Sequence, residues 1–342
     1  MTVKEYIFAH IAETTRKSDG KDPDLVVLPK PYTVPSIKDS FQEMYYWDTY
    51  FTNKGLILTG NIQQAINNLE NFAFLIEKFG YIPNGTRTPL LNRSQPPFFG
   101  LALKDVWSAL TVEQKQRFTN ALKVEYSFWQ SRRTNADGFE HYDAETNDDE
   151  YLAFTHFYER RVGVKTPHTI ERGRDIMAEA ESGWDFSPRF NHRCTEYAPI
   201  DLNCIMYINE MVIATFESDL IEKQKYENFA LLRKQKMLKY MFNGEFLNDA
   251  IPGKTVSNTV SVATLFPFLV GIQSDKITLK KLLYRLECKN GISACEKQNY
   301  NNTIYQWGYP NMWAPLVYFA FFALKQSGLI DDANRIGEKY LT

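Results

Sequence analysis

The chain has 342 residues, of which 44% are hydrophobic and 23% are charged, and its formal net charge at pH 7 is −2. This near balance of charge argues against a nucleic acid or an anionic membrane surface as partner. The longest apolar stretches, such as residues 264–272, are too short to span a bilayer.

The cysteines and the start of the sequence bear on location. Four cysteines in so long a chain do not make a disulfide framework. Cys288 and Cys295 have no CxxC pair and no flanking pair of histidines, so a zinc site is not expected. The first residues lack the apolar core of a signal peptide. We therefore predict a cytoplasmic protein with reduced thiols.

Apolar residues at helical spacing dominate the chain. In residues 60–79 they mark one face of a helix. Strand-like alternation is scarce, and the acidic run 143–150 is typical of a solvated loop. We predict one all-helical domain over 1–342, with a poorly defined segment at 1–33. Further helices are predicted over 112–130, 205–242 with a break at Ser218-Asp219, 256–271, 277–287, 312–326 and 330–340.

Aromatic residues are in excess, at 15% of the chain, and many stand beside polar residues in four short segments. Rings pack on the C–H faces of a sugar, while Asp, Asn, Gln and Arg bond its hydroxyls. The pattern therefore predicts a carbohydrate site on loops. The segments are 43–51 (EMYYWDTYF), 81–99 (YIPNGTRTPLLNRSQPPFF), 181–190 (ESGWDFSPRF) and 305–315 (YQWGYPNMWAP).

These four segments, together with DLN at 201–203, occur in an order that resembles the trehalases of glycoside hydrolase family 37. The resemblance runs from about residue 34 to the end of the chain. It implies an (α/α)₆ toroid that binds sugar in a funnel formed by the loops of the inner helices. It also implies hydrolysis of α,α-trehalose to two glucoses with inversion, without metal or organic cofactor.

The same resemblance assigns roles to particular residues. Asp185 stands where the family has its general acid, although by itself it would also fit a helix cap or an ion-pair partner. Flanking rings exclude water, which favours the protonated form of a carboxyl group. Inversion needs a second carboxylate about 6.5–9.5 Å away. The residues expected to line the sugar site are Trp47, Asp48, Asn84, Arg93, Ser94, Gln95 and Gly183, with Trp307 and Trp313 as ring platforms.

Three positions depart from the family pattern. Ser40 stands where a substrate-binding arginine is expected, and Gly308 where an aspartate usually follows Gln-Trp. Residues 165–169 (KTPHT) keep only the proline of an expected Arg-Pro-Glu motif. The alternatives for a lost arginine are Arg160, Arg161, Arg172 and Arg174.

The general base is not identified by the sequence. Relatives carry it in a Glu-Lys-Tyr-Asp segment followed by a glycine-rich loop, which is missing here. Residues 337–342 (GEKYLT) look similar, but Glu338 comes too soon after Pro315, so we predict that Glu338 lies on a helix surface. The chain is then a shortened member, a truncated one, or one that takes its base from elsewhere. Asp143, Glu145 and Glu150 stay open as alternatives.

Two other functions stay open at this point. The departures from the family pattern are compatible with an α-glucosidase that acts on another α-linked disaccharide. The missing base is compatible with a sugar-binding homologue that does not catalyse. In each case the expected partner is a small disaccharide, and the oligomeric state is not predicted.

Overall fold

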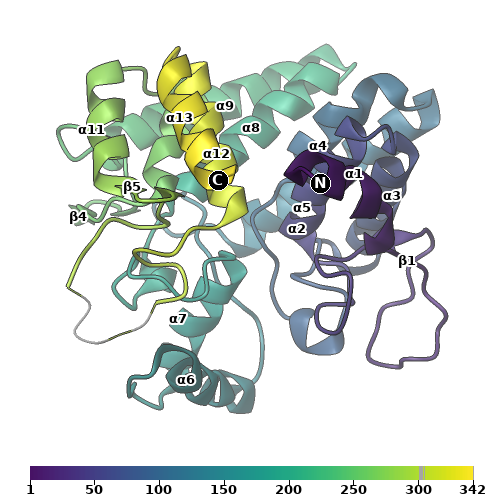
Figure 1. The fold of residues 1–342 in the computed structure, drawn as a ribbon, viewed down its shortest axis with the longest axis horizontal. Coiled ribbons are helices and arrows are strands. Elements are labelled where there is room, and N and C mark those ends of the chain that lie inside the picture. The colour runs from purple at the N-terminus through teal and green to yellow at the C-terminus, as the bar shows by residue number, and fades with distance from the viewer. Residues whose placement is uncertain (300–302, 304, 342) are drawn as a thin grey trace. The chain divides into compact units, whose positions relative to one another are not determined.

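The computed structural model describes residues 1–299, 303 and 305–341, and helices make up most of these residues (Figure 1). The strands are two residues long and form antiparallel pairs: β1 Thr15–Arg16 with β2 Tyr32–Thr33, β3 Ala250–Ile251 with β4 Thr255–Val256, and β5 Glu287–Cys288 with β6 Gly291–Ile292. The α-helices are α1 Val3–His10, α2 Tyr46–Leu58, α3 Ile62–Phe79, α4 Phe99–Val106, α5 Val112–Arg132, α6 Asp148–Val162, α7 Ile170–Glu181, α8 Ile200–Phe216, α9 Leu220–Tyr240, α10 Phe266–Leu269, α11 Lys276–Leu286, α12 Ala314–Gln326 and α13 Ile330–Leu341.

Most helices expected from apolar spacing are confirmed. They are α3, α5, α11, α12, α13, and the pair α8 and α9 with the chain break between them. The helix expected over 256–271 is wrong. That stretch contains β4, a 3-10 helix at Val262–Leu265 and the short α10. Residues 260–268 are all buried, so their apolar side chains mark no single helix face.

The prediction that residues 43–51 form a loop is also wrong, because α2 begins at Tyr46. In the first turn of α2, Tyr46, Trp47 and Thr49 are all buried, although they point in different directions around the helix. They therefore lack the one-sided apolar stripe by which a surface helix is recognised. The helices α6 and α7, rich in charged residues, were missed for the related reason that charge obscures their apolar faces.

The first of two compact units comprises residues 1–132 and 208–230. Its centre is α3, which packs against α2, α4 and α5. The α3 face that includes Leu69 and Phe72 is fully buried. The helix ends at Gly80, whose positive φ of 82° allows its N–H to bond the carbonyl of Ile76.

The second unit comprises residues 133–207 and 231–342. Here α6 packs along α7, and α12 packs on α10 and α13, as Figure 1 shows for the yellow pair α12 and α13. The contact of α6 with α7 is close, because a Cβ on Gly173 would lie 2.1 Å from the carbonyl oxygen of Tyr151. Side chains of Asn147 and Thr169 cap the two helices. This packing positions the segment that follows α7.

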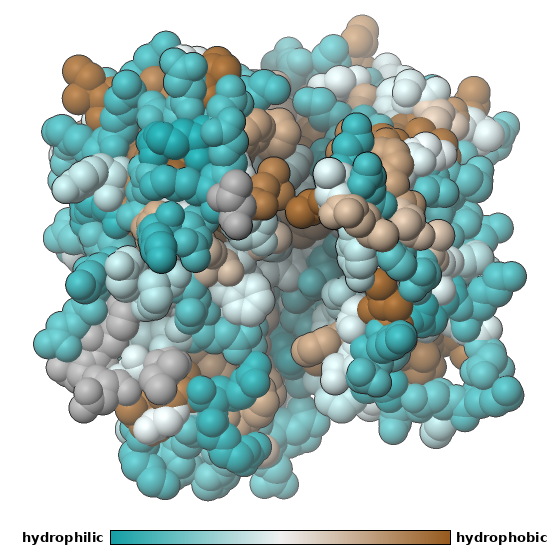
Figure 2. Space-filling view, viewed as in Figure 1, coloured by the Kyte–Doolittle hydropathy of each residue, from teal (hydrophilic) through white to brown (hydrophobic). Residues whose placement is uncertain are grey.

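Hydrophilic residues cover most of the face drawn in Figure 2, and apolar side chains there form scattered groups. Every helix within residues 1–299 and 305–341 is too short or not apolar enough to cross a membrane.

Candidate functional site

Two of the candidate residues of the first unit, Trp47 and Asp48, lie in the first turn of α2. The N–H groups of a first turn have no partner within the helix. The side-chain oxygen of Gln95 accepts the N–H of Trp47 at 3.0 Å, and the backbone oxygen of Asn84 accepts that of Tyr46 at 3.1 Å. The start of α2 is thus built on the segment that carries the other candidates.

That segment folds back on itself through short hydrogen bonds. The backbone N–H of Asn84 donates to the carbonyl of Arg93 at 2.8 Å, and its side-chain amide donates to the carbonyl of Ser94 at 3.3 Å. The hydroxyl of Ser94 donates to the carbonyl of Ile82 at 2.7 Å. These contacts bring together six predicted residues, here called the α2 cluster: Trp47, Asp48, Asn84, Arg93, Ser94 and Gln95.

Asp48 is the carboxylate of the α2 cluster. It is half-buried beside the buried ring of Trp47, which lies parallel to Phe98 with 6.5 Å between ring centroids. Burial raises the pKa of Asp48 to about 6. The oxygens of this carboxyl group can accept hydrogen bonds from sugar hydroxyls.

In the second unit, Asp185 lies in the turn that follows α7. Gly183 has a φ of 77°, a left-handed conformation that suits glycine and reverses the chain. Trp184 and Phe186 are buried on either side, while Asp185 itself is half-buried. The carbonyl of Phe186 accepts the N–H of Trp307 at 3.1 Å, which ties this turn to the segment 305–315.

Three tryptophan rings gather at this turn. Trp184 and Trp307 have their centroids 5.7 Å apart, and Trp307 stacks on Trp313 at 4.5 Å with 13° between planes. The indole N–H of Trp313 donates to the carbonyl of Gln306 at 3.0 Å. We call the group of Gly183, Asp185, Trp307 and Trp313 the α7 cluster. Its four predicted members are brought together within one unit.

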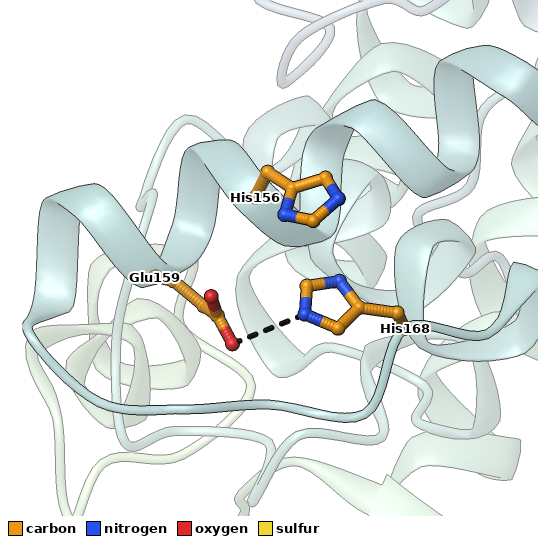
Figure 3. A group of neighbouring side chains, drawn as sticks. All are labelled: His156, Glu159 and His168. Atoms are coloured by element: carbon orange, nitrogen blue, oxygen red, sulfur yellow. Dashed lines mark ion pairs between the residues drawn. The ribbon is translucent and has the colours of Figure 1, made fainter.

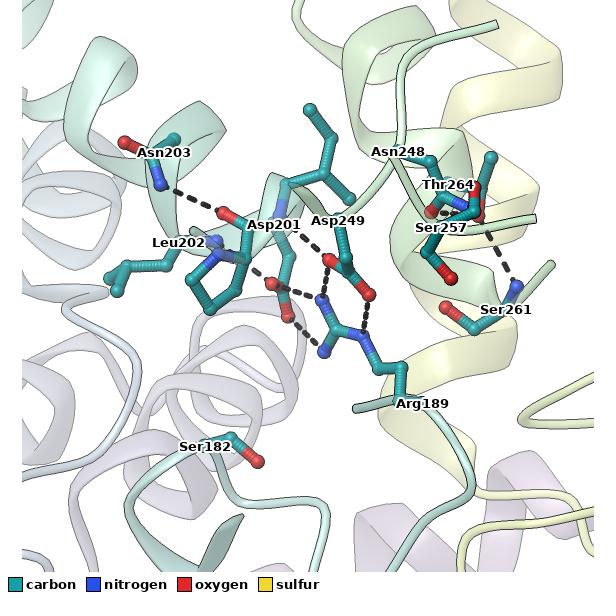
Figure 4. Close-up of polar contacts among 12 residues, drawn as sticks. Ser182, Arg189, Asp201, Leu202, Asn203, Asn248, Asp249, Ser257, Ser261 and Thr264 are labelled. Carbon is teal, nitrogen blue, oxygen red and sulfur yellow. Dashed lines mark hydrogen bonds and ion pairs between the residues drawn. The ribbon is translucent and has the colours of Figure 1, made fainter. Parts of the chain in front are cut away.

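A buried charge network holds the end of this turn (Figure 4). Arg189 is 1% exposed and makes paired hydrogen bonds to both Asp201, near the start of α8, and Asp249, before β3. Its guanidinium carbon also lies 4.6 Å from the ring centroid of Trp184. Planar paired contacts of this kind fix an arginine in one orientation. Arg189 therefore anchors the ring next to Asp185.

A second buried carboxyl, Glu179 in α7, was missed by the sequence reasoning. It is fully buried and accepts the N–H of Ser187 at 3.3 Å, while its backbone carbonyl accepts the hydroxyl of Ser182 at 2.6 Å. Burial raises the pKa of Glu179 to about 8, with Arg172 acting to lower it and the charge of Asp185 adding to the rise. One sequence feature could have indicated that Glu179 is buried: it stands between two small residues, Ala178 and Ala180.

A family model described as "Trehalase" matches residues 3–342 of this chain. The chain belongs to the trehalase family. The resemblance stated from the sequence is thereby confirmed.

Curated relatives in this family include periplasmic trehalases from two bacteria. That of Xanthomonas campestris pv. campestris is 32% identical over 348 residues, which cover 93% of this chain and 60% of the relative. That of Pseudomonas aeruginosa is 31% identical over 348 residues, with coverage of 93% and 63%. The chain thus spans less than two thirds of the length of these trehalases.

Solved structures support the expected fold. The neutral trehalase from Saccharomyces cerevisiae matches with a TM-score of 0.79 at 24% identity, covering 99% of this chain and 72% of the other. A mannosylglycerate hydrolase from Thermus thermophilus matches with a TM-score of 0.64 at 10% identity, covering 98% and 90%. The predicted all-helical (α/α)₆ fold is confirmed by the match to the trehalase structure.

The predicted cytoplasmic location is wrong. The curated relatives from both bacteria are named periplasmic trehalases. The prediction was based on the few cysteines and on the start of the sequence, and neither decides the location of a chain that spans 60% of its relative.

Asp143, Glu145 and Glu150 were the alternatives for the general base, and the structure places each of them. Arg174 forms an ion pair with Asp143, which is buried, and Arg133 donates to Glu145 at 2.8 Å. Glu150 lies in the first turn of α6. The interpretation of residues 143–150 as a solvated loop holds for Glu145 and Asn147, which are exposed and outside any helix, whereas Asp143 is buried and α6 begins at Asp148. Glu338 is exposed on α13, as predicted.

The arginines weighed as replacements have distinct surroundings. Arg161 on α6 donates to the side chain of Gln306 at 2.8 Å, which places it beside the segment that carries Trp307. Arg172 is buried and bonds the Thr166 hydroxyl at 2.8 Å and His192. Of these two, Arg161 contacts the segment of the α7 cluster directly.

Proposed function

We propose that this chain carries the catalytic acid of a trehalase and takes part in the hydrolysis of α,α-trehalose to two glucoses. The observation that carries the proposal is the setting of Asp185. Its carboxyl is half-buried between two buried rings, in a turn anchored by Arg189 and Glu179. Membership of the trehalase family supports trehalose over another α-linked disaccharide.

Asp185 acts as the general acid. A carboxyl that holds its proton near neutral pH can give it to the glycosidic oxygen as the bond to the leaving glucose breaks. In an inverting reaction, water attacks from the opposite face of the sugar with the help of a second carboxylate. One bond of trehalose is cleaved, so one glucose forms as the β-anomer and the other leaves as the α-anomer.

Each cluster by itself offers groups that suit a sugar. In the α7 cluster, the rings of Trp307 and Trp313 suit the C–H face of a glucose. In the α2 cluster, the side chains of Asp48, Asn84 and Arg93 suit sugar hydroxyls. Glu179, whose carboxyl keeps its proton at neutral pH, holds Ser187 and thereby the turn of Asp185 without adding a negative charge next to it. Glu179 is therefore a positioning residue. The assignment of residues 1–342 to one catalytic domain stays a prediction.

The decisive experiment replaces Asp185 with Asn and follows glucose release from trehalose. The amide cannot donate a proton as an acid, so kcat should fall by about 100-fold or more, the range attributed to general acid catalysis. Thermal unfolding should be unchanged within about 1 kcal/mol, because the site is only partly buried. Early NMR spectra of the wild-type reaction should show equal amounts of α- and β-glucose.

The matched control is Glu338→Gln, which neutralises an exposed carboxylate on α13 and should leave glucose release unchanged. Wild-type activity in Asp185→Asn would refute the role of Asp185. A wild-type chain that binds trehalose in calorimetry but releases no glucose would instead identify a non-catalytic homologue. Cleavage of another α-linked disaccharide in preference to trehalose would refute the substrate.

A further inference from the structure

Three side chains with metal-ligating atoms gather where α6 ends and the chain leads to α7 (Figure 3). His156 and Glu159 stand three positions apart on α6, which places them on the same face. His168 comes from the segment between the helices. One ligand atom from each residue lies within 4.8 Å of the others. The sequence reasoning, which examined only the cysteines, gave no sign of this group.

The hydrogen bonds of His168 indicate how its ring is protonated. The hydroxyl of Thr155 donates to the carbonyl of Leu152 at 2.7 Å, because a carbonyl can only accept. The Nδ1 atom of His168 lies 2.6 Å from the same hydroxyl oxygen. Because the hydroxyl proton of Thr155 is used in the bond to Leu152, the Nδ1 atom of His168 must carry a hydrogen and donate it to the hydroxyl oxygen. In the neutral ring this leaves the lone pair on Nε2.

That lone pair faces a carboxylate. The Nε2 atom of His168 lies 3.4 Å from Oε1 of Glu159, the contact drawn as a dashed line in Figure 3. Glu159 also accepts the N–H of Thr166 at 2.9 Å and the ammonium group of Lys165 at 3.2 Å, as an ionised carboxylate does. An imidazole nitrogen and a carboxylate oxygen are both atoms that ligate metal ions.

We propose that His156, Glu159 and His168 form a binding site for a divalent transition metal of the zinc class. Two imidazoles and one carboxylate are a ligand set typical of zinc, and they leave a fourth position for water. A histidine ligand usually donates its other ring N–H to an oxygen, as His168 does to Thr155. The oxygen-rich shells of Ca²⁺ or Mg²⁺ need more carboxylates than this group offers.

The surroundings leave room for the ion. A surface hollow of about 320 Å³ is lined by two of the three ligands, His156 and Glu159, together with Arg160, Gly163, Val164 and Lys165. Two of these neighbours are positive and oppose a cation. Lys165 is 93% exposed in its side chain, however, and such a surface ion pair contributes little and can separate. The metal would then tie the end of α6 to the segment that leads into α7.

The proposal is tested on the full chain after treatment with chelator and dialysis. Calorimetry with Zn²⁺ alone should give one ion per chain, and Co²⁺ in its place should give the visible absorption of a four-coordinate site. The variants His156→Gln, His168→Gln and Glu159→Gln should each bind at least tenfold more weakly. Thr155→Val, which removes only the hydroxyl partner of His168, should lose about 10–100-fold in affinity.

The matched control is His10→Gln. His10 also stands beside a carboxylate, with its Nδ1 2.8 Å from Glu13, but it belongs to the other unit and to no group of three ligands among the described residues. This variant should bind Zn²⁺ like the wild type. The proposal is overturned if the wild type binds no Zn²⁺ or if His168→Gln binds it equally well. A His168 pKa raised above 7 by NMR, without Zn²⁺ binding, would show that a proton is the cation.

Discussion

The α2 cluster and the α7 cluster are held by different kinds of contact. In the first, neutral hydrogen bonds such as that from Trp47 to Gln95 connect a turn to a helix start. The turn that carries the second is anchored by Arg189, which is buried between Asp201 and Asp249. A neutral hydrogen bond contributes about 1 kcal/mol net, whereas removing one member of a buried ion pair costs about 3–5 kcal/mol. The α7 cluster should therefore depend far more on charge.

The largest effect is expected for Arg189→Met. It leaves two buried aspartates without their cation, so the free energy of unfolding should fall by about 3–5 kcal/mol, measured by denaturant titration. The matched control is Arg117→Met in the first unit. Arg117 pairs with Glu70 and Glu77 at 40% side-chain exposure, so its loss should cost less than about 1 kcal/mol.

A triple variant sharpens this result. Arg189→Met combined with Asp201→Asn and Asp249→Asn removes all three charges, and it should recover part of the stability that the single variant loses. If Arg189→Met and Arg117→Met cost the same, burial does not make the Arg189 network more important than an exposed ion pair.

One buried glutamate in each unit should make the stability of the fold depend on pH. Burial raises the pKa of Glu125 in the first unit and of Glu179 in the second to about 8, from an ordinary value of 4.5. Between these values the folded chain keeps the proton that the unfolded chain releases. Each group thus contributes a stability that is fully present below about pH 4.5 and is lost as pH rises through about 8, at roughly 1.4 kcal/mol per pH unit.

The variants Glu125→Gln and Glu179→Gln should each flatten the fall of stability between pH 5 and 8, followed by thermal unfolding. Only Glu179→Gln should also change the pH profile of kcat, because Glu179 and the charge of Asp185 act on each other. An altered profile in Glu125→Gln, or an unaltered one in Glu179→Gln, would contradict the positioning role.

Substitution of one glycine in each unit tests how closely the helices of that unit are packed. A Cβ on Gly173 would lie 2.1 Å from the backbone oxygen of Tyr151, and one on Gly100 would lie 2.2 Å from the side-chain oxygen of Asn209. Backbone yields less than a side chain, so Gly173→Ala should cost about 1–3 kcal/mol and Gly100→Ala less. Unfolding in urea measures both, and a larger loss in Gly100→Ala would refute the reasoning.

The smallest effect is expected at the α2 cluster. Gln95→Ala removes the acceptor for the first-turn N–H of Trp47 and should cost about 1 kcal/mol. Gln95→Glu keeps an acceptor and places a negative charge at a helix N-terminus, which should restore that stability. Equal melting temperatures for the Ala and Glu variants would show that this contact does not hold the helix start.

The sequence predicted those helices whose apolar residues lie on one face. The α3 pattern gave the helix to within two residues of its start. It failed where burial is continuous, as at 260–268, and where charge hides the apolar face, as in α6 and α7. Periodicity reports a difference between two faces, and neither case offers one.

The candidate residues could be named from local motifs, but the groups that support them could not. Gln95 approaches Trp47 across 48 positions, and Arg189 meets Asp249 across 60. Glu179 looks like any helical glutamate until α7 is packed. His156 and His168 lie close together only because the chain turns after α6. Their spacing in the sequence does not predict that they could bind one metal ion.

By itself, the sequence determined the family, the helical class and the identity of the carboxyl placed between rings, because these depend on residue types in a fixed order. The tertiary structure decided which charges are buried and what compensates them. Burial and ion pairing are properties of groups distant in sequence that share a low-dielectric interior, so only the folded chain shows that Asp143 is paired and that burial raises the pKa of Glu179.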